Sequence, residues 1–166
     1  WTGLVGDPGL IPFAPESLDA VVSLLALQTV DDLPGTLAQI RRALKPDGLF
    51  LACLLGGQTL FELRDVFARA ESEIEGGISP RVAPFADLRD LGGLLQRAGF
   101  ALPVADCETL AVRYGTPLAL LNDLRAMGAT NILRERRKTP LKRATLMRAL
   151  ELYQELYADP DGRVRA

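Results

Sequence analysis

The side chains that could do chemistry are few, because the chain contains no histidine. Ser-His-Asp triads, Cys-His dyads, zincin motifs and histidine-ligated metal sites all need an imidazole, so the composition excludes them. Two cysteines are too few for a disulfide scaffold and are typical of a reducing compartment. We expect Cys53, inside an apolar run, to be a buried small apolar residue. Cys107 has no base beside it that could activate the thiol.

Residues 56–59, Gly-Gly-Gln-Thr, are the segment best suited to hold an anion, because they separate an expected strand from an expected helix. Backbone N–H groups at a helix N-terminus bind anions, and the same residues also suit a plain tight turn. Gly3, Gly6 and Gly9 do not form a dinucleotide-binding fingerprint, and no phosphate-binding P-loop motif occurs. Both readings of residues 56–59 therefore stay open.

Charge is distributed unevenly along a chain whose net charge is −2. Residues 1–110 are net acidic and residues 111–166 net basic. The basic cluster is either a docking face for an acidic partner or nucleic acid, or a solvated helix pair, and it lacks the interleaved aromatics of a single-strand stacking platform. Its members are Arg134, Arg136, Arg137, Lys138, Lys142, Arg143 and Arg148. Glu71, Glu73 and Glu75 would spread over different faces of a helix, so we expect solvated carboxylates rather than a cation site.

The elements that must position these residues begin with a strand, a helix and a second strand. Residues 18–25 form a nearly continuous apolar run, which is typical of a strand buried on both faces in a parallel sheet. Residues 31–34, Asp-Asp-Leu-Pro, indicate a capped helix start, and residues 45–48, Lys-Pro-Asp-Gly, its end. Residues 49–55 form a second buried strand. We therefore expect an α/β fold with a parallel βαβ unit and helices on the sheet faces, in three layers.

The remaining segments are expected to be mostly helical. Apolar residues recur at helical spacing from Leu60 to Ile74 and from Leu88 to Ala98, and glycines stop both runs. Further elements are helices at 116–128 and 139–157, strands or extended segments at 101–104 and 110–114, and a turn at 160–162. We expect a single domain over residues 1–166, with a sheet core at 1–55 and 85–114. Segments 56–84 and 116–157 would be helical lid or substrate elements at the carboxyl edge of the sheet.

The length of 166 residues leaves room for one domain. No apolar run approaches the roughly 20 residues of a membrane span, and the first ten residues lack a signal-peptide pattern. We therefore expect a cytoplasmic, bacterial protein.

The order of motifs between Asp7 and Gly48 resembles class I S-adenosylmethionine-dependent methyltransferases. That family has an Asp, then Leu-Pro-Phe, then Phe-Asp-x-Val-x-Ser, then Leu-Lys-Pro-Gly-Gly. The corresponding segments here are Gly6-Asp7, Ile11-Pro12-Phe13, residues 17–23, residues 37–42 and residues 44–48. The resemblance implies a partial Rossmann-like sheet, with residues 18–23 on the fourth strand of the family and residues 49–55 on the fifth.

Beyond the fifth strand the resemblance narrows to methyltransferase-like assembly factors of mitochondrial respiratory complex I and their bacterial relatives. It is carried by residues 56–64, 75–80, 87–100, 127–131 and 153–162. The malonyl-carrier-protein methyltransferases of the biotin pathway are more distant, and they share the Gly-Ala-Thr of residues 128–130.

The resemblance implies S-adenosylmethionine as cofactor and carries over roles only at matching positions. Asp7 would accept from the adenine amino group, and Ser23, Leu24 and Gln28 would lie beside the methionine portion of the cofactor. Gly57 and Thr59 would face the substrate. Gln28 stands where relatives often have His. No catalytic residue and no metal ligand is assigned.

The leading interpretation is a methyltransferase whose acceptor is unknown. The alternative is a complex I assembly factor acting on an arginine of a respiratory subunit by hydroxylation, and a third possibility is a non-catalytic interaction module. The family's glycine-rich motif and ribose-binding acid would precede Trp1, so we expect residues 1–166 alone to bind S-adenosylmethionine poorly. An unpaired flank of the first strand would favour a homo-oligomer formed through that sheet edge.

Overall fold

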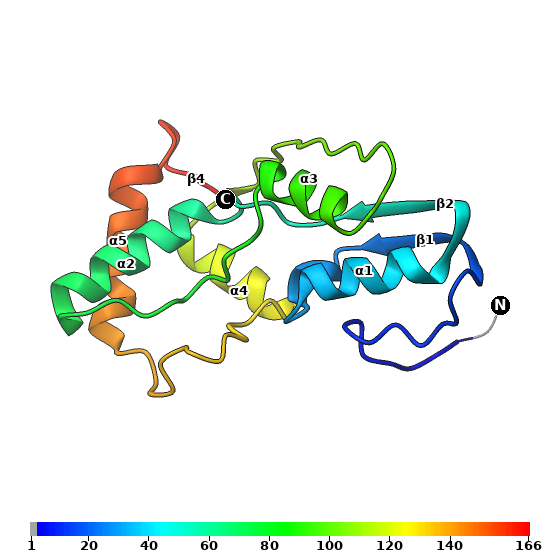
Figure 1. Cartoon of the computed structure of the whole chain (residues 1–166). Coiled ribbons are helices and arrows are strands. Elements are labelled where there is room, and N and C mark those ends of the chain that lie inside the picture. Colours follow the sequence, from blue (N-terminus) through cyan, green and yellow to red (C-terminus); the bar gives the residue numbers. More distant parts are fainter. Residues whose placement is uncertain (1–2) are drawn as a thin grey trace. The chain divides into compact units, whose positions relative to one another are not determined.

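The computed structural model describes residues 3–166, so residues 1 and 2 of the expected sheet core lie outside the described residues. The chain divides into two compact units: Trp1–Gly57 with Phe85–Cys107, and Gln58–Pro84 with Glu108–Ala166. The first holds β1 (Leu18–Leu24), the 3-10 turn η1 (Leu27–Thr29), α1 (Leu33–Ala43), β2 (Leu44–Cys53) and α3 (Leu88–Arg97) (Figure 1). The second holds α2 (Phe61–Glu75), β3 (Arg113–Tyr114), α4 (Pro117–Ala126), α5 (Arg143–Tyr157) and β4 (Val164–Arg165).

The expected βαβ unit is confirmed. β1 and β2 pair in parallel, with Ala20 opposite Leu49 and Leu24 opposite Cys53, and α1 forms the crossover. The Asp32 carboxylate caps α1 by accepting from the Gly35 N–H at 2.9 Å, and a proline occupies the first turn. An Asp cap and an early proline satisfy and preorganise the first turn, which is why the sequence marks this helix start clearly.

The expected turn at residues 45–48 occurs inside β2, which begins at Leu44 rather than at Leu49. The register shifts here, because Leu18 pairs with Leu44 and Ala20 already pairs with Leu49. Asp47 adopts a left-handed conformation with φ 60°. A side chain at Gly48 would lie 3.0 Å from the Lys45 carbonyl oxygen and 3.3 Å from that of Asp19. Glycine therefore allows the bulge to return close against β1.

Helices cover one face of this sheet. Leu37 and Ile40 of α1 are buried in a cluster that also receives Leu94 and Leu95 of α3. The ring of Phe50, on β2, stacks on Phe100 with centroids 5.2 Å apart. The α/β fold class is therefore confirmed, with α1 and α3 against the same side of the sheet.

The other face carries apolar side chains that remain exposed. Val22 is 60% exposed, Leu24 73%, Leu49 53% and Leu51 51%. The expectations of strands buried on both faces and of a three-layer core are therefore wrong for residues 3–166. Cys53 is also exposed, against expectation, because it alternates onto this uncovered face.

The second unit has its own core between α2 and α5. Val66 and Ala70 of α2 and Tyr153 of α5 are at most 1% exposed, and Val164 of β4 is fully buried with them. β3 and β4 form a short antiparallel pair, with Arg113 opposite Arg165 and Tyr114 opposite Val164.

The strands expected between residues 101 and 114 are mostly absent from the structure. Residues 101–104 form no strand, and the strand expected at 110–114 is reduced to Arg113–Tyr114. Leu102 and Val104 are 93% and 89% exposed, so no side-chain packing stabilises a strand there. The last helix begins at Arg143 rather than at 139, whereas α2 and α3 lie where apolar spacing and glycine stops predicted them and α4 follows Thr116 as predicted. None of the helices within residues 3–166 is long and apolar enough to cross a membrane.

Candidate functional site

Two polar atoms at the carboxyl end of β1 are buried without a hydrogen-bond partner among the described residues. They are the hydroxyl oxygen of Ser23 and the amide oxygen of Gln28. After β1 the chain turns at Leu25, with φ 51°, into η1, and the Gln28 amide nitrogen donates to the Leu25 carbonyl at 2.6 Å. This bond holds one end of the amide. An unmet buried polar group costs about 1–3 kcal/mol, so each of these atoms is a candidate for contact with a ligand or with water.

The chemistry of this pair fits the amino-acid portion of the expected cofactor. A hydroxyl both donates and accepts, and an amide oxygen accepts, so the two suit a carboxylate and an ammonium group. Ligands of open α/β sheets also bind at the carboxyl ends of the strands. The contacts of Ser23 and Gln28 with the cofactor remain predictions.

Leu24 and Gly57 flank the same strand ends. The side chain of Leu24 points to the uncovered face of the sheet, where it is 73% exposed. A side chain at Gly57 would lie 3.4 Å from the Phe85 carbonyl oxygen and 3.5 Å from Asp87 Cβ. Glycine therefore lets the chain leaving β2 pass close to the residues that open α3. The substrate-facing role of Gly57 remains a prediction.

Asp7 takes part in a local turn. One of its carboxylate oxygens accepts from the Gly9 N–H at 2.8 Å, and the Asp7 carbonyl accepts from the Leu10 N–H at 3.0 Å. This geometry is typical of an Asx turn. An aspartate in such a turn has a fixed backbone, and its adenine contact remains a prediction.

Thr59 belongs to the second unit, unlike the other predicted site residues. Its carbonyl accepts from the Arg64 guanidinium at 3.3 Å. The helix α2 that follows is capped by Leu60, which is left-handed at φ 55° and makes no side-chain cap. The structure therefore gathers Asp7, Ser23, Leu24, Gln28 and Gly57 in one unit and assigns Thr59 to the other.

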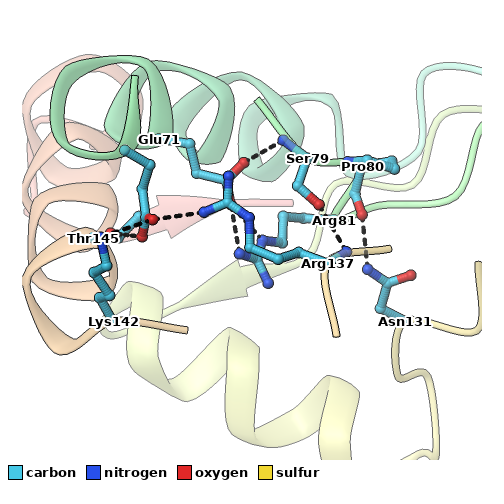
Figure 2. Close-up of polar contacts among 9 residues, drawn as sticks. Glu71, Ser79, Pro80, Arg81, Asn131, Arg137, Lys142 and Thr145 are labelled. Atoms are coloured by element: carbon cyan, nitrogen blue, oxygen red, sulfur yellow. Dashed lines mark hydrogen bonds and ion pairs between the residues drawn. The ribbon is translucent and has the colours of Figure 1, made fainter. Parts of the chain in front are cut away.

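Two carboxylates of α2 contradict the expectation of solvated glutamates. Glu71 is fully buried: it accepts from the Ser79 N–H at 2.6 Å and from Nε of Arg81 at 2.8 Å (Figure 2). The side chain of Glu75 is 7% exposed and receives Arg137, Lys142 and Thr145. Their burial could not be read from the sequence, because their partners lie up to 70 residues away.

Glu73 is the member of the trio that matches the expectation of a solvated carboxylate. Its side chain is 47% exposed and pairs with Arg148 of α5 at 2.7 Å. Together with the pairs of Glu75, this bridge engages Arg137, Lys142 and Arg148 of the basic cluster inside the molecule. Part of the positive charge that suggested an acidic partner is therefore neutralised by α2.

Acid–base and metal chemistry find little support in the described residues. Burial raises the pKa of Tyr153, and its hydroxyl donates to the Arg165 carbonyl at 2.6 Å, which is a structural use of the phenol. No group of three or more Cys, Asp or Glu that could hold a metal ion occurs in residues 3–166.

Comparison with known proteins finds one matching domain model and two kinds of curated relative. Residues 2–52 match the model of a methyltransferase domain. The mitochondrial arginine-hydroxylase NDUFAF5 of Homo sapiens is 43% identical over 163 residues, covering 98% of this chain and 47% of the relative. The malonyl-[acyl-carrier protein] O-methyltransferase of Xylella fastidiosa is 39% identical over 153 residues, covering 92% and 50%. The chain thus spans about half the length of the curated relatives that it matches.

Solved structures agree with the fold. A putative methyltransferase of Bacillus halodurans superposes with a TM-score of 0.54 at 17% identity, covering 96% of this chain and 68% of the other. The YcgJ protein of Bacillus subtilis gives 0.56 at 12% identity, covering 96% and 64%. The motif order from Asp7 to Gly48, the parallel βαβ unit and the relatives all agree. The chain thus carries a methyltransferase domain at residues 2–52 and resembles class I S-adenosylmethionine-dependent methyltransferases in fold.

Proposed function

We propose that the complete protein binds S-adenosylmethionine and transfers its methyl group to an acceptor. The observation that carries this proposal is the pair of buried, unpartnered polar atoms on Ser23 and Gln28 at the carboxyl end of β1. The comparisons support the same cofactor, because the matching domain model and several relatives are methyltransferases.

The bound cofactor would supply an electrophilic methyl group. A lone pair on the acceptor forms the new bond to the methyl carbon, the carbon–sulfur bond breaks toward sulfur, and the acceptor releases a proton. The products are the methylated acceptor and S-adenosylhomocysteine. Such a displacement depends mainly on alignment of the acceptor with the methyl group, which can lower the barrier by on the order of 7–11 kcal/mol. The lack of histidine therefore does not oppose it.

Calorimetric titration of the complete protein with S-adenosylmethionine tests the site. Ser23→Ala removes a polar atom that has no internal partner. Gln28→Leu removes another, together with the amide nitrogen that donates to the Leu25 carbonyl, and each variant should weaken binding about tenfold or more. Thr29→Ala is the matched control, because the Thr29 hydroxyl already donates to the Ala26 carbonyl at 2.7 Å. Unchanged affinity in both test variants would contradict the placement of the cofactor.

Arginine hydroxylation is the second candidate, and a specific observation favours it. Relatives named arginine-hydroxylase reach 43% identity across almost the whole chain. In that case the acceptor would be an arginine of a protein, such as a respiratory complex I subunit, and an oxidant of the dioxygen class with a reductant would be consumed. Mass spectrometry of an arginine-containing substrate separates the two: methyl transfer adds a methylene and yields S-adenosylhomocysteine, whereas hydroxylation adds an oxygen and yields none.

Three broader expectations belong to the same proposal. The protein would act in the bacterial cytoplasm, its two units would work as one domain, and the helical segments 56–84 and 116–157 would form a lid that chooses the substrate. Homo-oligomers through the edge of β1 are the expected association, because exposed strand edges pair readily. Light scattering of the purified chain measures that association directly.

A further inference from the structure

Loop 78–84 lies beside α2 in the second unit and forms one wall of a cavity of about 520 Å³. The floor is Arg64, Phe67 and Ala68 of α2, and the loop contributes Ile78, Ser79, Pro80, Arg81, Val82 and Pro84. The shape of this cavity therefore depends on what holds the loop in place.

Glu71 fixes the inner side of the loop. Its carboxylate takes the Ser79 N–H on one oxygen and the Arg81 guanidinium on the other. Gly76, left-handed at φ 69°, ends α2 and lets the chain fold back so soon. These partners are at most 10 residues apart in sequence, so this attachment is local and forms with α2 itself.

A second segment, residues 131–142, covers the outer side of the same loop, and we call it the strap. The strap has no helix or strand. The Asn131 amide donates to the Pro80 carbonyl at 2.8 Å, and the Arg137 N–H donates to the Ser79 hydroxyl at 3.1 Å (Figure 2). Loop 78–84 is thus held from both sides, by Glu71 from within and by the strap from without.

The strap is anchored to α2 mainly through charge. Arg137 pairs with Glu75 at 2.6 Å, and Lys142, at the end of the strap, pairs with the same oxygen at 3.1 Å. Ile132 within the strap is 58% exposed and Leu133 is only partly buried. Leu141, next to Lys142, packs against the core, so apolar burial is concentrated at one end of the strap. Segments held by polar contacts with little buried apolar surface belong to the least stable parts of a fold.

We propose that the strap is a detachable cover: it opens as a unit while Glu71 keeps loop 78–84 on α2. Glu71 and Glu75 lie one helical turn apart, and each holds a different segment. Glu71 makes the local attachment that survives opening, and Glu75 makes the distant one that is lost. Opening frees the outer side of Ser79 and Pro80, and with it one wall of the cavity.

Amide hydrogen exchange of the complete chain, read by NMR, tests this division. The Arg137 N–H reports the strap, the Ser79 N–H reports the loop, and the Ala70 N–H of α2 reports global unfolding. In the unmodified chain the Arg137 N–H should exchange faster than the other two. Raising the salt to about 1 M, where the screening length falls to roughly 3 Å, should accelerate it further without a mutation.

The variant Glu75→Gln should accelerate exchange at the Arg137 N–H about tenfold or more and leave the Ser79 N–H nearly unchanged. Glu73→Gln is the matched control: it removes the same charge from the same helix but only loses the exposed pair with Arg148, so neither amide should respond. Two results would overturn the proposal. One is exchange of the Arg137 N–H as slow as that of Ala70 at every salt concentration. The other is faster exchange at both the Ser79 and the Arg137 N–H in Glu75→Gln, which would mean that the loop and the strap open as one rigid body.

Discussion

The two units differ in how their central elements place apolar side chains and buried polar groups. In the first, the parallel sheet leaves Val22, Leu24, Leu49 and Leu51 exposed, and buried atoms of Ser23 and Gln28 lack partners. In the second, α2 and α5 enclose a core with fully buried Val66 and Val164, and the buried carboxylate of Glu71 has both its oxygens engaged. The unpartnered atoms of Ser23 and Gln28 thus lie where a ligand is proposed, whereas the buried carboxylate of Glu71 is satisfied within the second unit.

The largest expected effect comes from breaking the buried ion pair of the second unit. Glu71→Ala leaves the Arg81 guanidinium and the Ser79 N–H without their partner in a site that is largely closed to water. Removing one member of a buried pair costs about 3–5 kcal/mol, so the free energy of unfolding should fall by that amount in urea titrations. Glu73→Ala, on the same helix, should change it by less than about 1 kcal/mol. Equal effects of the two would show that Glu71 is not closed off from water.

A pair of identical substitutions compares the two faces of the sheet. Leu37 of α1, which packs against the covered face of the sheet, is 2% exposed, whereas Leu51 on the open face is 51% exposed. Leu37→Ala should lower the free energy of unfolding by about 2–5 kcal/mol, because it removes buried apolar area and leaves a cavity. Leu51→Ala should lie within about 0.5 kcal/mol of the unmodified chain. A large loss at Leu51 that depends on protein concentration would reveal self-association over this face.

Substitutions of Asp7 in the complete protein test its predicted contact with the adenine of the cofactor. Asp7→Ala should weaken S-adenosylmethionine binding by about 1–3 kcal/mol, the cost of an unpaired buried donor. Asp7→Asn is the informative companion, because its amide oxygen can keep the bond to the Gly9 N–H while its charge is lost. Calorimetry that finds no change in affinity for either variant would make Asp7 a turn residue alone.

Acid pH should weaken the second unit through carboxylates whose pKa is lowered, among them Glu75 and Asp159. The Thr145 hydroxyl, with Lys142 and Arg137, holds the pKa of Glu75 below its ordinary value, and Arg165 does the same for Asp159. A carboxylate whose pKa is lowered by folding stabilises the native state above its unfolded pKa, and this stabilisation is lost as the pH falls through the lowered pKa. The melting temperature should therefore fall between about pH 5 and pH 3.

The double variant Glu75→Gln/Asp159→Asn should flatten that fall, because neither replacement titrates. Differential scanning calorimetry at several pH values measures it. A fall of the same size in the double variant would assign the acid sensitivity to other carboxylates.

Local signals in the sequence were sufficient for α1, α2, α3 and α4. Asp32 and Thr116 cap helices where helix starts were expected, and Gly76 stops one, since caps and stops act within one helical turn of the residue; the Asp87 cap of α3 was not predicted. The βαβ unit also followed from its apolar runs. Strands at 101–104 and 110–112 failed, because a strand needs a partner that its own residues do not specify.

The candidate site was likewise predicted from the sequence only in part. Family motifs along the sequence pointed to Asp7, Ser23, Gln28 and Gly57, and the structure adds that Ser23 and Gln28 carry buried atoms with no partner.

The sequence by itself determined the βαβ order and the placement of α1 to α4, because these depend on residues that are neighbours along the chain. Only the tertiary structure decided which apolar face of the sheet is covered and which glutamates are buried. Glu71, Glu73 and Glu75 share one alternating pattern, yet one is enclosed, one lies at the surface and one anchors a strap whose Arg137 is 62 residues away. Burial is a property of the assembled neighbours, and no local pattern contains it.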